Sequence, residues 1–243
     1  MSDVELAPPT PEVPPRSRRR PLLVAVLLVL VLALASSPWW APLALGQLAY
    51  FRLRRVEVRG AYYIAPSDIL RRLSVDTSAS VWQPLAPLTA RVSRHPGLLS
   101  ARVRRALPGT LVVSVVERQP VALVAGPTGF QAFDESGVAL PIDLTRVPVD
   151  APILRQRDTT LFRLIGRMRV EAPSLYRRLG EARRQGQDEV VLRLDSTVVR
   201  ATTDVSPARL LELEPVEQDL ATRRVRVAEL DLRFRDQVIA RLP

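Results

Sequence analysis

The sequence contains no cysteine, no lysine and only one histidine, His95, among its 243 residues. Without cysteine the chain cannot form a disulfide framework, a thiolate zinc site or an iron–sulfur cluster. Because all 35 basic residues are arginine, lysine chemistry such as a P-loop or a Schiff base is also excluded. A single histidine argues against multi-histidine metal sites and most histidine-relayed catalysis. We therefore expect a binding or scaffolding protein with no catalytic residue, no metal site and no cofactor.

An enzyme such as an exported hydrolase is the alternative class. The sequence has no Gly-x-Ser-x-Gly motif and no histidine cluster. The nearest approach to an acid/base pair is Asp134 with Glu135, which are followed by Ser136 and Gly137. That order is typical of a turn between two short strands. The sequence therefore favours a structural role for these carboxylates.

Positive charge is concentrated in one part of the chain. The formal net charge is +10, and residues 53–118 carry 11 arginines against four acidic residues. A small segment with an excess of +7 indicates an anionic neighbour, which could be nucleic acid, lipid headgroups or an acidic protein. Arg102 and Arg104 alternate with apolar residues, so the simplest interpretation is that they lie on the solvated face of a strand.

A long apolar run near the N-terminus predicts a membrane anchor. Residues 22–35 contain no polar side chain, and no charge follows until after Leu45. About 20 such residues span a bilayer. Four arginines precede the run and Trp39 with Trp40 follow it, which favours a cytoplasmic N-terminus and an exported C-terminal part. We predict a disordered cytoplasmic tail over 1–20 and a transmembrane helix over 21–41.

A cleaved signal peptide is the competing interpretation. Ala33, Leu34 and Ala35 before Ser36 fit a small-residue cleavage site. The long preceding tail and the apolar residues that follow favour a retained anchor. Both interpretations place the rest of the chain outside the cytoplasm, so we expect no nucleic-acid partner.

The segment after the anchor predicts a small β-α-α-β-β domain. Residues 53–59 alternate apolar and polar side chains and end at Gly60, as a half-buried strand does. Two short helices are expected after Pro66 and over 85–94. Two further alternating segments, 101–107 and 110–118, are joined by Pro108-Gly109 and predict a hairpin.

These residues resemble a known family. A strand ending in V-x-V-x-G after a membrane span, Trp82, and the stretch HPGLLSARVRRALPGTLVVSVVERQPVAL resemble the POTRA domain of the FtsQ/DivIB family of bacterial division proteins. The resemblance implies a POTRA domain over 53–121. POTRA domains also occur in protein secretion and outer-membrane assembly, which is the alternative function; those proteins continue into a transmembrane β-barrel, for which this sequence has no pattern.

The remaining residues, 122–243, predict a mixed β domain with flanking helices. Short strands are expected over 121–125, 130–133 and 138–140, and a hairpin over 189–202. Apolar residues at helical spacing predict three helices, carrying Leu161, Ile165 and Met168; Leu175, Leu179 and Ala182; and Leu210, Leu211 and Leu213 until Pro215. The whole chain is thus expected to be α+β, with one transmembrane helix before the two domains.

The last segment carries the predicted partner site. The string ELDLRF-RDQVIARL resembles the end of the FtsQ β domain, in which the final strands present a sheet edge to the partner FtsB, which brings FtsL. Exposed edges offer unpaired backbone groups to an extended partner. The resemblance implies partner binding by Arg233, Phe234, Val238, Ile239 and Ala240. The alternative is that Phe234 and Ile239 are ordinary core residues.

Taken together, the resemblance implies a non-catalytic divisome scaffold in septal peptidoglycan synthesis. It implies a single-pass protein of the bacterial inner membrane at the division septum, with its C-terminus in the periplasm. Partners would be FtsB and FtsL at the C-terminal edge, and other division proteins through the POTRA domain and the transmembrane helix. Whether the basic face of residues 53–118 binds lipid or protein stays open.

Overall fold

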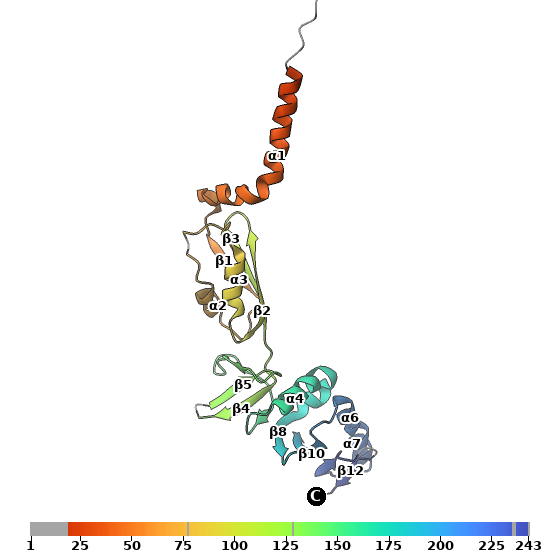
Figure 1. Cartoon of the computed structure of the whole chain (residues 1–243). Coiled ribbons are helices and arrows are strands. Elements are labelled where there is room, and N and C mark those ends of the chain that lie inside the picture. Colours follow the sequence, from red (N-terminus) through yellow and green to blue (C-terminus); the bar gives the residue numbers. More distant parts are fainter. Residues whose placement is uncertain (1–18, 77, 128, 235–236, 243) are drawn as a thin grey trace, which may run out of the picture.

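The computed structural model describes residues 19–76, 78–127, 129–234 and 237–242. The predicted cytoplasmic tail therefore lies almost entirely outside the described residues. The chain runs from a long N-terminal helix through a three-stranded sheet to a nine-stranded sheet (Figure 1). The predicted α+β architecture is confirmed.

The N-terminal helix, α1 (Arg19–Gly46), contains the apolar run. Its stretch Leu23–Gly46 has a mean hydropathy of 2.2 and is long and apolar enough to cross a membrane, as expected of a single-pass membrane protein. Pro38 and Pro42 lie inside it, and each removes a backbone hydrogen bond. Figure 1 shows α1 turning sharply in its second half, as these prolines lead one to expect.

The first domain has the predicted β-α-α-β-β order. After a short 3₁₀ helix (Ala49–Phe51), the elements are β1 (Arg55–Arg59), α2 (Pro66–Leu73), α3 (Leu85–Ser93), β2 (Leu98–Ala106) and β3 (Thr110–Glu117). The sheet order is β1-β3-β2, with β1 parallel and β2 antiparallel to β3. Leu111, Val113 and Val115 of β3 pack against Ile69 and Leu73 of α2 and Leu88 and Val92 of α3 to form a core. On the opposite face of β3, Val112 is still buried, whereas Val116 is exposed.

The second domain is built on one mixed sheet. Its strands are β4 (Ala122–Gly126), β5 (Gly129–Phe133), β6 (Ala139–Leu140), β7 (Ile153–Leu154), β8 (Leu179–Gln185), β9 (Glu189–Leu194), β10 (Thr197–Thr202), β11 (Glu229–Asp231) and β12 (Ile239–Arg241). They are ordered β12-β11-β10-β9-β8-β7-β4-β5-β6, so β12 and β6 form the two edges.

Four helices cover one face of this sheet: α4 (Thr159–Glu171), α5 (Pro173–Arg178), α6 (Pro207–Leu211) and α7 (Leu213–Thr222). Asp158 caps α4, since its carboxylate accepts the backbone N–H groups of Thr160 and Leu161. Buried residues of the helices and of the inner sheet face form a single core. The other face of strands β8 to β12 carries mostly charged and polar residues, with Val191, Val198 and Ile239 among them.

Two helix predictions in this domain need correction. The helix predicted to carry Leu175, Leu179 and Ala182 ends at Arg178, and the last two residues lie on β8. The register of β8 against β9 shifts between Leu179 and Glu181, so two buried strand residues stand three apart and imitate helical spacing. Pro215 does not end a helix either, because it lies in the first turn of α7, where no N–H is needed. The helix breaks earlier, at Glu212.

Candidate functional site

The C-terminal strands form the free edge at which partner binding is predicted. β11 runs parallel to β10, and β12 pairs antiparallel with β11 so that Leu230 faces Ala240 and Asp231 faces Ile239. Alternation of apolar and charged residues in this segment puts Leu230 into the core and Asp231 on the open face. Within the described residues no strand pairs with the outer side of β12. Its outer backbone groups are available to an added strand.

The five predicted site residues lie together along this edge but differ in exposure. Phe234 and Ile239 are 46% and 38% exposed, so neither is an ordinary core residue. Val238 and Ala240 are half-buried and pack against the core. Arg233 precedes the connection between the two strands. Exposed apolar side chains beside an unpaired edge are what an apolar partner strand would contact.

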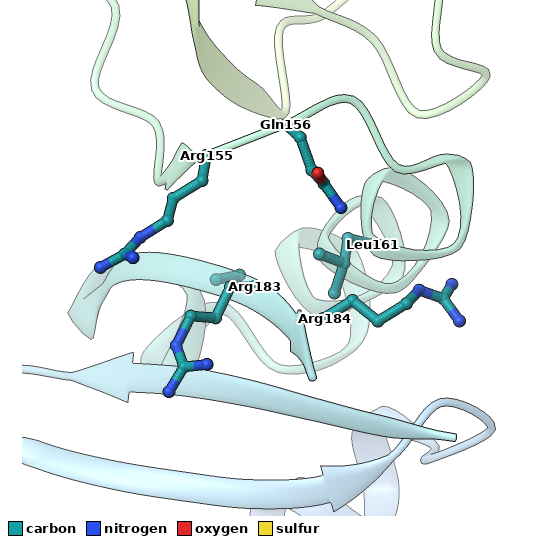
Figure 2. Close-up of a pocket in the computed structure, with 6 residues that line it drawn as sticks. Arg155, Gln156, Leu161, Arg183 and Arg184 are labelled. Carbon is teal, nitrogen blue, oxygen red and sulfur yellow. The ribbon is translucent and has the colours of Figure 1, made fainter. Parts of the chain in front are cut away.

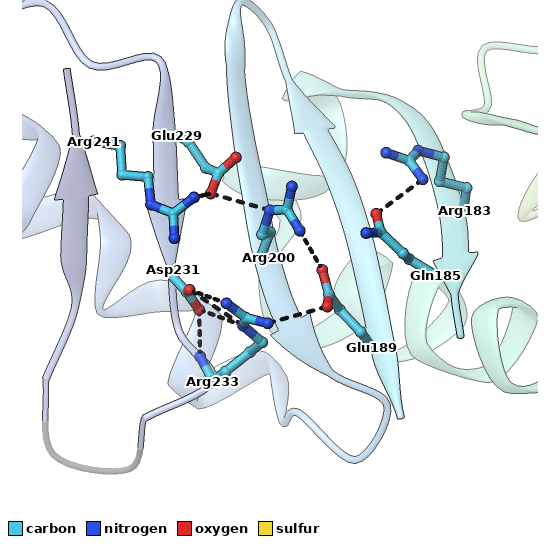
Figure 3. A network of polar contacts seen from close by, with 8 residues as sticks. All are labelled: Arg183, Gln185, Glu189, Arg200, Glu229, Asp231, Arg233 and Arg241. Atoms are coloured by element: carbon cyan, nitrogen blue, oxygen red, sulfur yellow. Dashed lines mark hydrogen bonds and ion pairs between the residues drawn. The ribbon is translucent and has the colours of Figure 1, made fainter. Parts of the chain in front are cut away.

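The guanidinium group of Arg233 is already engaged within the protein. Its Nη2 and Nε donate to the Asp231 carboxylate at 2.6 and 2.9 Å, and its Nη1 lies 3.2 Å from Glu189 Oε2 (Figure 3). The backbone N–H of Arg233 also donates to Asp231 at 3.1 Å. Arg233 thus ties the start of the connection to β11 and to β9.

The Arg233 contacts belong to a wider polar network on the open face. Arg200 on β10 pairs with Glu189 on β9 at 2.9 Å and with Glu229 on β11 at 3.0 Å (Figure 3). Arg241 on β12 reaches Glu229 at 3.1 Å. The ion pairs cross four neighbouring strands, so they hold the strands in register while leaving little free charge near the edge. A partner there would be recognised mainly by backbone pairing and apolar contact.

Asp231 is the buried acid at the centre of this arrangement, with only 1% of its surface exposed. The hydrogen bonds from Arg233 hold the pKa of Asp231 below its usual value, against the opposing effect of burial. Asp231 is therefore ionised at neutral pH, and the Arg233 contact is fully formed there.

Arg209 on α6 is a residue of this site that the sequence pattern did not reveal. Its Nη2 donates to the backbone carbonyls of Phe234 at 2.8 Å and of Gln237 at 3.2 Å. Phe234 and Gln237 both lie in the connection between β11 and β12, so Arg209 ties this connection to α6 at two points. Glu189 was missed in the same way, since 44 residues separate it from Arg233. Spacing in the sequence carries no signal for such long-range contacts.

A cavity of about 190 Å³ in the second domain is lined by Arg155, Arg183, Arg184 and Leu161 (Figure 2). Arg155 is paired with Glu181 at 3.0 Å and Arg184 with Asp158 at 2.6 Å, so most of its charge is compensated. Across the described ranges, no three His, Asp or Glu side chains lie where they could hold a metal ion.

Asp134 acts in the turn that its sequence predicts. Its carboxylate accepts the backbone N–H groups of Ser136 and Val138, and Gly137 has a φ of +83°. Burial opposes ionisation of Asp134, but hydrogen bonds from Ser136, Val138 and Arg118 outweigh it and lower the pKa. The ion pair with Arg118, 2.7 Å long, joins the end of β3 to this turn and so links the two domains.

Comparison with known proteins relates the chain to one family. The family described as "POTRA domain, FtsQ-type" matches residues 51–118, the first domain. The chain is 38% identical to the cell division protein FtsQ of Rhodothermus marinus over 141 residues, which are 56% of this chain and 49% of that protein. FtsQ of Mycobacteroides abscessus is 30% identical over 75% of this chain and 60% of its own length. FtsQ of Salinibacter ruber is 29% identical over 77% of this chain and 81% of its own.

The matched part covers about half to three fifths of the first two relatives. Among solved structures, the major extracytoplasmic domain of the division protein DivIB from Geobacillus stearothermophilus matches 45% of this chain at 22% identity, with a TM-score of 0.33. The relationship to the FtsQ proteins therefore rests on the sequence identities and on the match of the POTRA domain.

Proposed function

We propose that this protein is a non-catalytic scaffold of the bacterial division machinery, because it carries an FtsQ-type POTRA domain and is related to the FtsQ cell division proteins. In this role α1 holds the protein in the inner membrane, with the N-terminus in the cytoplasm and both domains in the periplasm. The C-terminal edge recruits FtsB, and through it FtsL, for septal peptidoglycan synthesis. The POTRA domain and α1 contact other division proteins.

The free edge of β12 is the observation that carries this proposal. An extended segment of FtsB would continue the sheet by pairing with the outer side of β12, and its apolar side chains would contact Phe234 and Ile239. Val238 and Ala240 provide the packed base of the strand. Arg233, bound to Asp231 and Glu189, positions the chain before the connection. Binding of FtsB would thus rest on backbone pairing with β12 and on apolar contacts with two exposed side chains.

The test is binding of the extracytoplasmic segment of FtsB to the full chain in detergent. Phe234→Asp puts a charge where the partner's apolar side chains would pack, and we expect a loss of affinity of about 30-fold, the loss typical of an interface hot spot. Val170→Asp is the matched control, because Val170 lies on α4 away from the edge and is 80% exposed. Unchanged affinity of Phe234→Asp, with the fold intact by circular dichroism, would remove Phe234 from the site.

The cellular role is tested by fluorescent localisation of the full chain. Enrichment at midcell is the expected result. A uniform envelope signal would count against a division role, even if the edge bound a partner strand in vitro.

A further inference from the structure

One end of the POTRA domain lies next to α1, because the connection is short. α1 ends at Gly46 and β1 begins at Arg55, with the 3₁₀ helix Ala49–Phe51 between them. The β2–β3 turn lies at the same end: the carbonyl of Gly109 accepts the N–H groups of Arg54 and Arg55 at 2.8 and 3.2 Å. Figure 1 shows this end of the domain next to the bent second half of α1. We call this surface the anchor-proximal end; it consists of Tyr50, Arg52, Arg54, Arg55, Arg104, Arg105 and Leu107.

The arginines of the anchor-proximal end are not neutralised by the protein. Arg52, Arg54, Arg55 and Arg104 are exposed, and among the described residues none of them has a carboxylate within ion-pair distance. Arg105 donates to the backbone carbonyls of Val81 and Gln83 and lies over the Trp82 ring, so its contacts bring no opposite charge. Five positive charges are therefore gathered on one end of a small domain.

The acids of this domain are engaged elsewhere. Glu57 pairs with Arg59 at 2.9 Å, and Asp68 pairs with Arg71. The carboxylate of Asp76 accepts hydrogen bonds from Ser78. At the opposite end of the sheet, Glu117 is buried and accepts the N–H groups of Tyr63 and Ile64. The acids therefore do not offset the arginines of the anchor-proximal end, although Arg72, Arg91, Arg94 and Arg102 carry further positive charge elsewhere in the domain.

Exposed apolar and aromatic side chains accompany these arginines. Leu107, at the β2–β3 turn, is 57% exposed, and Tyr50 is 61% exposed. Trp39, in the bent second half of α1, is 85% exposed. Aromatic side chains favour the headgroup level of a bilayer, and a leucine among arginines suits the same boundary. A charged protein partner would account for the arginines but not for the exposed leucine at the turn.

We propose that the anchor-proximal end binds the anionic lipid headgroups of the membrane that α1 spans. The arginines contact lipid phosphates, while Leu107 and Tyr50 enter the interface beside the end of α1. This inference depends on α1 lying in a bilayer and goes beyond the division role, since it holds whatever partner binds β12. Each arginine near an anionic surface raises the partition constant roughly fivefold. The tether supplied by α1 keeps the surface at high effective lipid concentration.

The experiment uses the full chain in lipid nanodiscs. Because the sequence has no cysteine, Leu107→Cys and Leu99→Cys each accept a single spin label. Both leucines are exposed and lie at opposite ends of β2, Leu99 near its start and Leu107 just after its last residue, so the Leu99 label is the matched control. The label at 107 should become accessible to a lipid-soluble relaxation agent in discs of phosphatidylglycerol and phosphatidylcholine. In discs of phosphatidylcholine alone, or at 1 M salt, it should remain accessible to a water-soluble agent.

Charge variants separate the electrostatic contact from simple proximity. A triple variant, Arg52→Gln with Arg54→Gln and Arg104→Gln, should lower the equilibrium constant for contact of the anchor-proximal end with the bilayer roughly 100-fold. Lys at the same three positions should keep this constant unchanged. The control is Arg71→Gln, Arg72→Gln and Arg94→Gln, which removes the same charge from exposed positions on and after α2 and α3. That control should leave the label at 107 in the lipid. Equal behaviour of the two triple Gln variants, equal contact in neutral discs, or a label at 107 that never leaves water would each overturn the proposal.

Discussion

Replacing Asp231 by asparagine removes the charge that holds the C-terminal edge in place. In the folded protein this carboxylate accepts hydrogen bonds from Nε, Nη2 and the backbone N–H of Arg233. Asp231 is almost fully buried. A hydrogen bond to a charged group contributes about 1.5–3 kcal/mol. Two of the three donors belong to one side chain that is 35% exposed, so solvent reduces their contribution. We expect Asp231→Asn to destabilise the edge by about 2 kcal/mol.

Hydrogen exchange of the full chain in detergent measures this loss where it occurs. A change of about 2 kcal/mol corresponds to a roughly 30-fold increase in opening of the edge, seen as faster exchange of the amides of β11 and β12. Amides of β2 and β3 serve as the internal control, because that sheet shares no strand with the edge. Unchanged exchange in β11 and β12 would show that the Arg233–Asp231 contact does not stabilise the edge.

The same carboxylate links the stability of the edge to pH. The folded-state pKa of Asp231 is lowered, so its contribution is fully present above the unfolded value of about 3.9 and is lost as the pH falls through the folded pKa. Asp134 and Asp158 shift in the same direction, so the second domain as a whole loses stability in acid. The difference between the wild type and Asp231→Asn isolates the part due to Asp231. It should be largest at neutral pH and vanish in strong acid.

Two further substitutions test the packing of the two domains. Gly60 has a φ of +85°, and a Cβ added there would lie 2.3 Å from the Val115 carbonyl oxygen. Gly60→Ala should therefore destabilise the POTRA domain by about 2 kcal/mol or more in urea unfolding. A variant as stable as the wild type would show that the turn adapts. Phe162 is 1% exposed and stacks on Phe133 at 5.2 Å, so Phe162→Ala should cost about 3–5 kcal/mol in the second domain and leave β1 to β3 unaffected. A cost below 1 kcal/mol would mean that the core collapses around the missing ring.

The order of elements in the POTRA domain could be predicted from the sequence, because each element there carries a local signal. Alternating side chains mark β1, β2 and β3, and Pro66 begins α2. In the second domain the prediction was wrong where two local signals conflict. The irregular register of β8 places Leu179 and Ala182 at helical spacing, although both face the core from a strand.

The candidate edge could be located from the sequence, but its contacts could not. Alternation and the family resemblance indicate the two final strands and the five residues on them. The bonds that hold this segment come from Arg209 and Glu189, which lie 25 and 44 residues from their partners. The exposure of Phe234 and Ile239 is set by the position of β12 at the end of the sheet, which only the three-dimensional topology provides.

The most direct test of the scaffold proposal is hydrogen exchange of the full chain with and without the extracytoplasmic segment of FtsB. If FtsB adds a strand to the sheet, amides in 237–242 become protected, whereas those of β6 at the opposite edge do not change. Protection of β6 or of the POTRA strands, with 237–242 exchanging as in the free protein, would contradict the proposal.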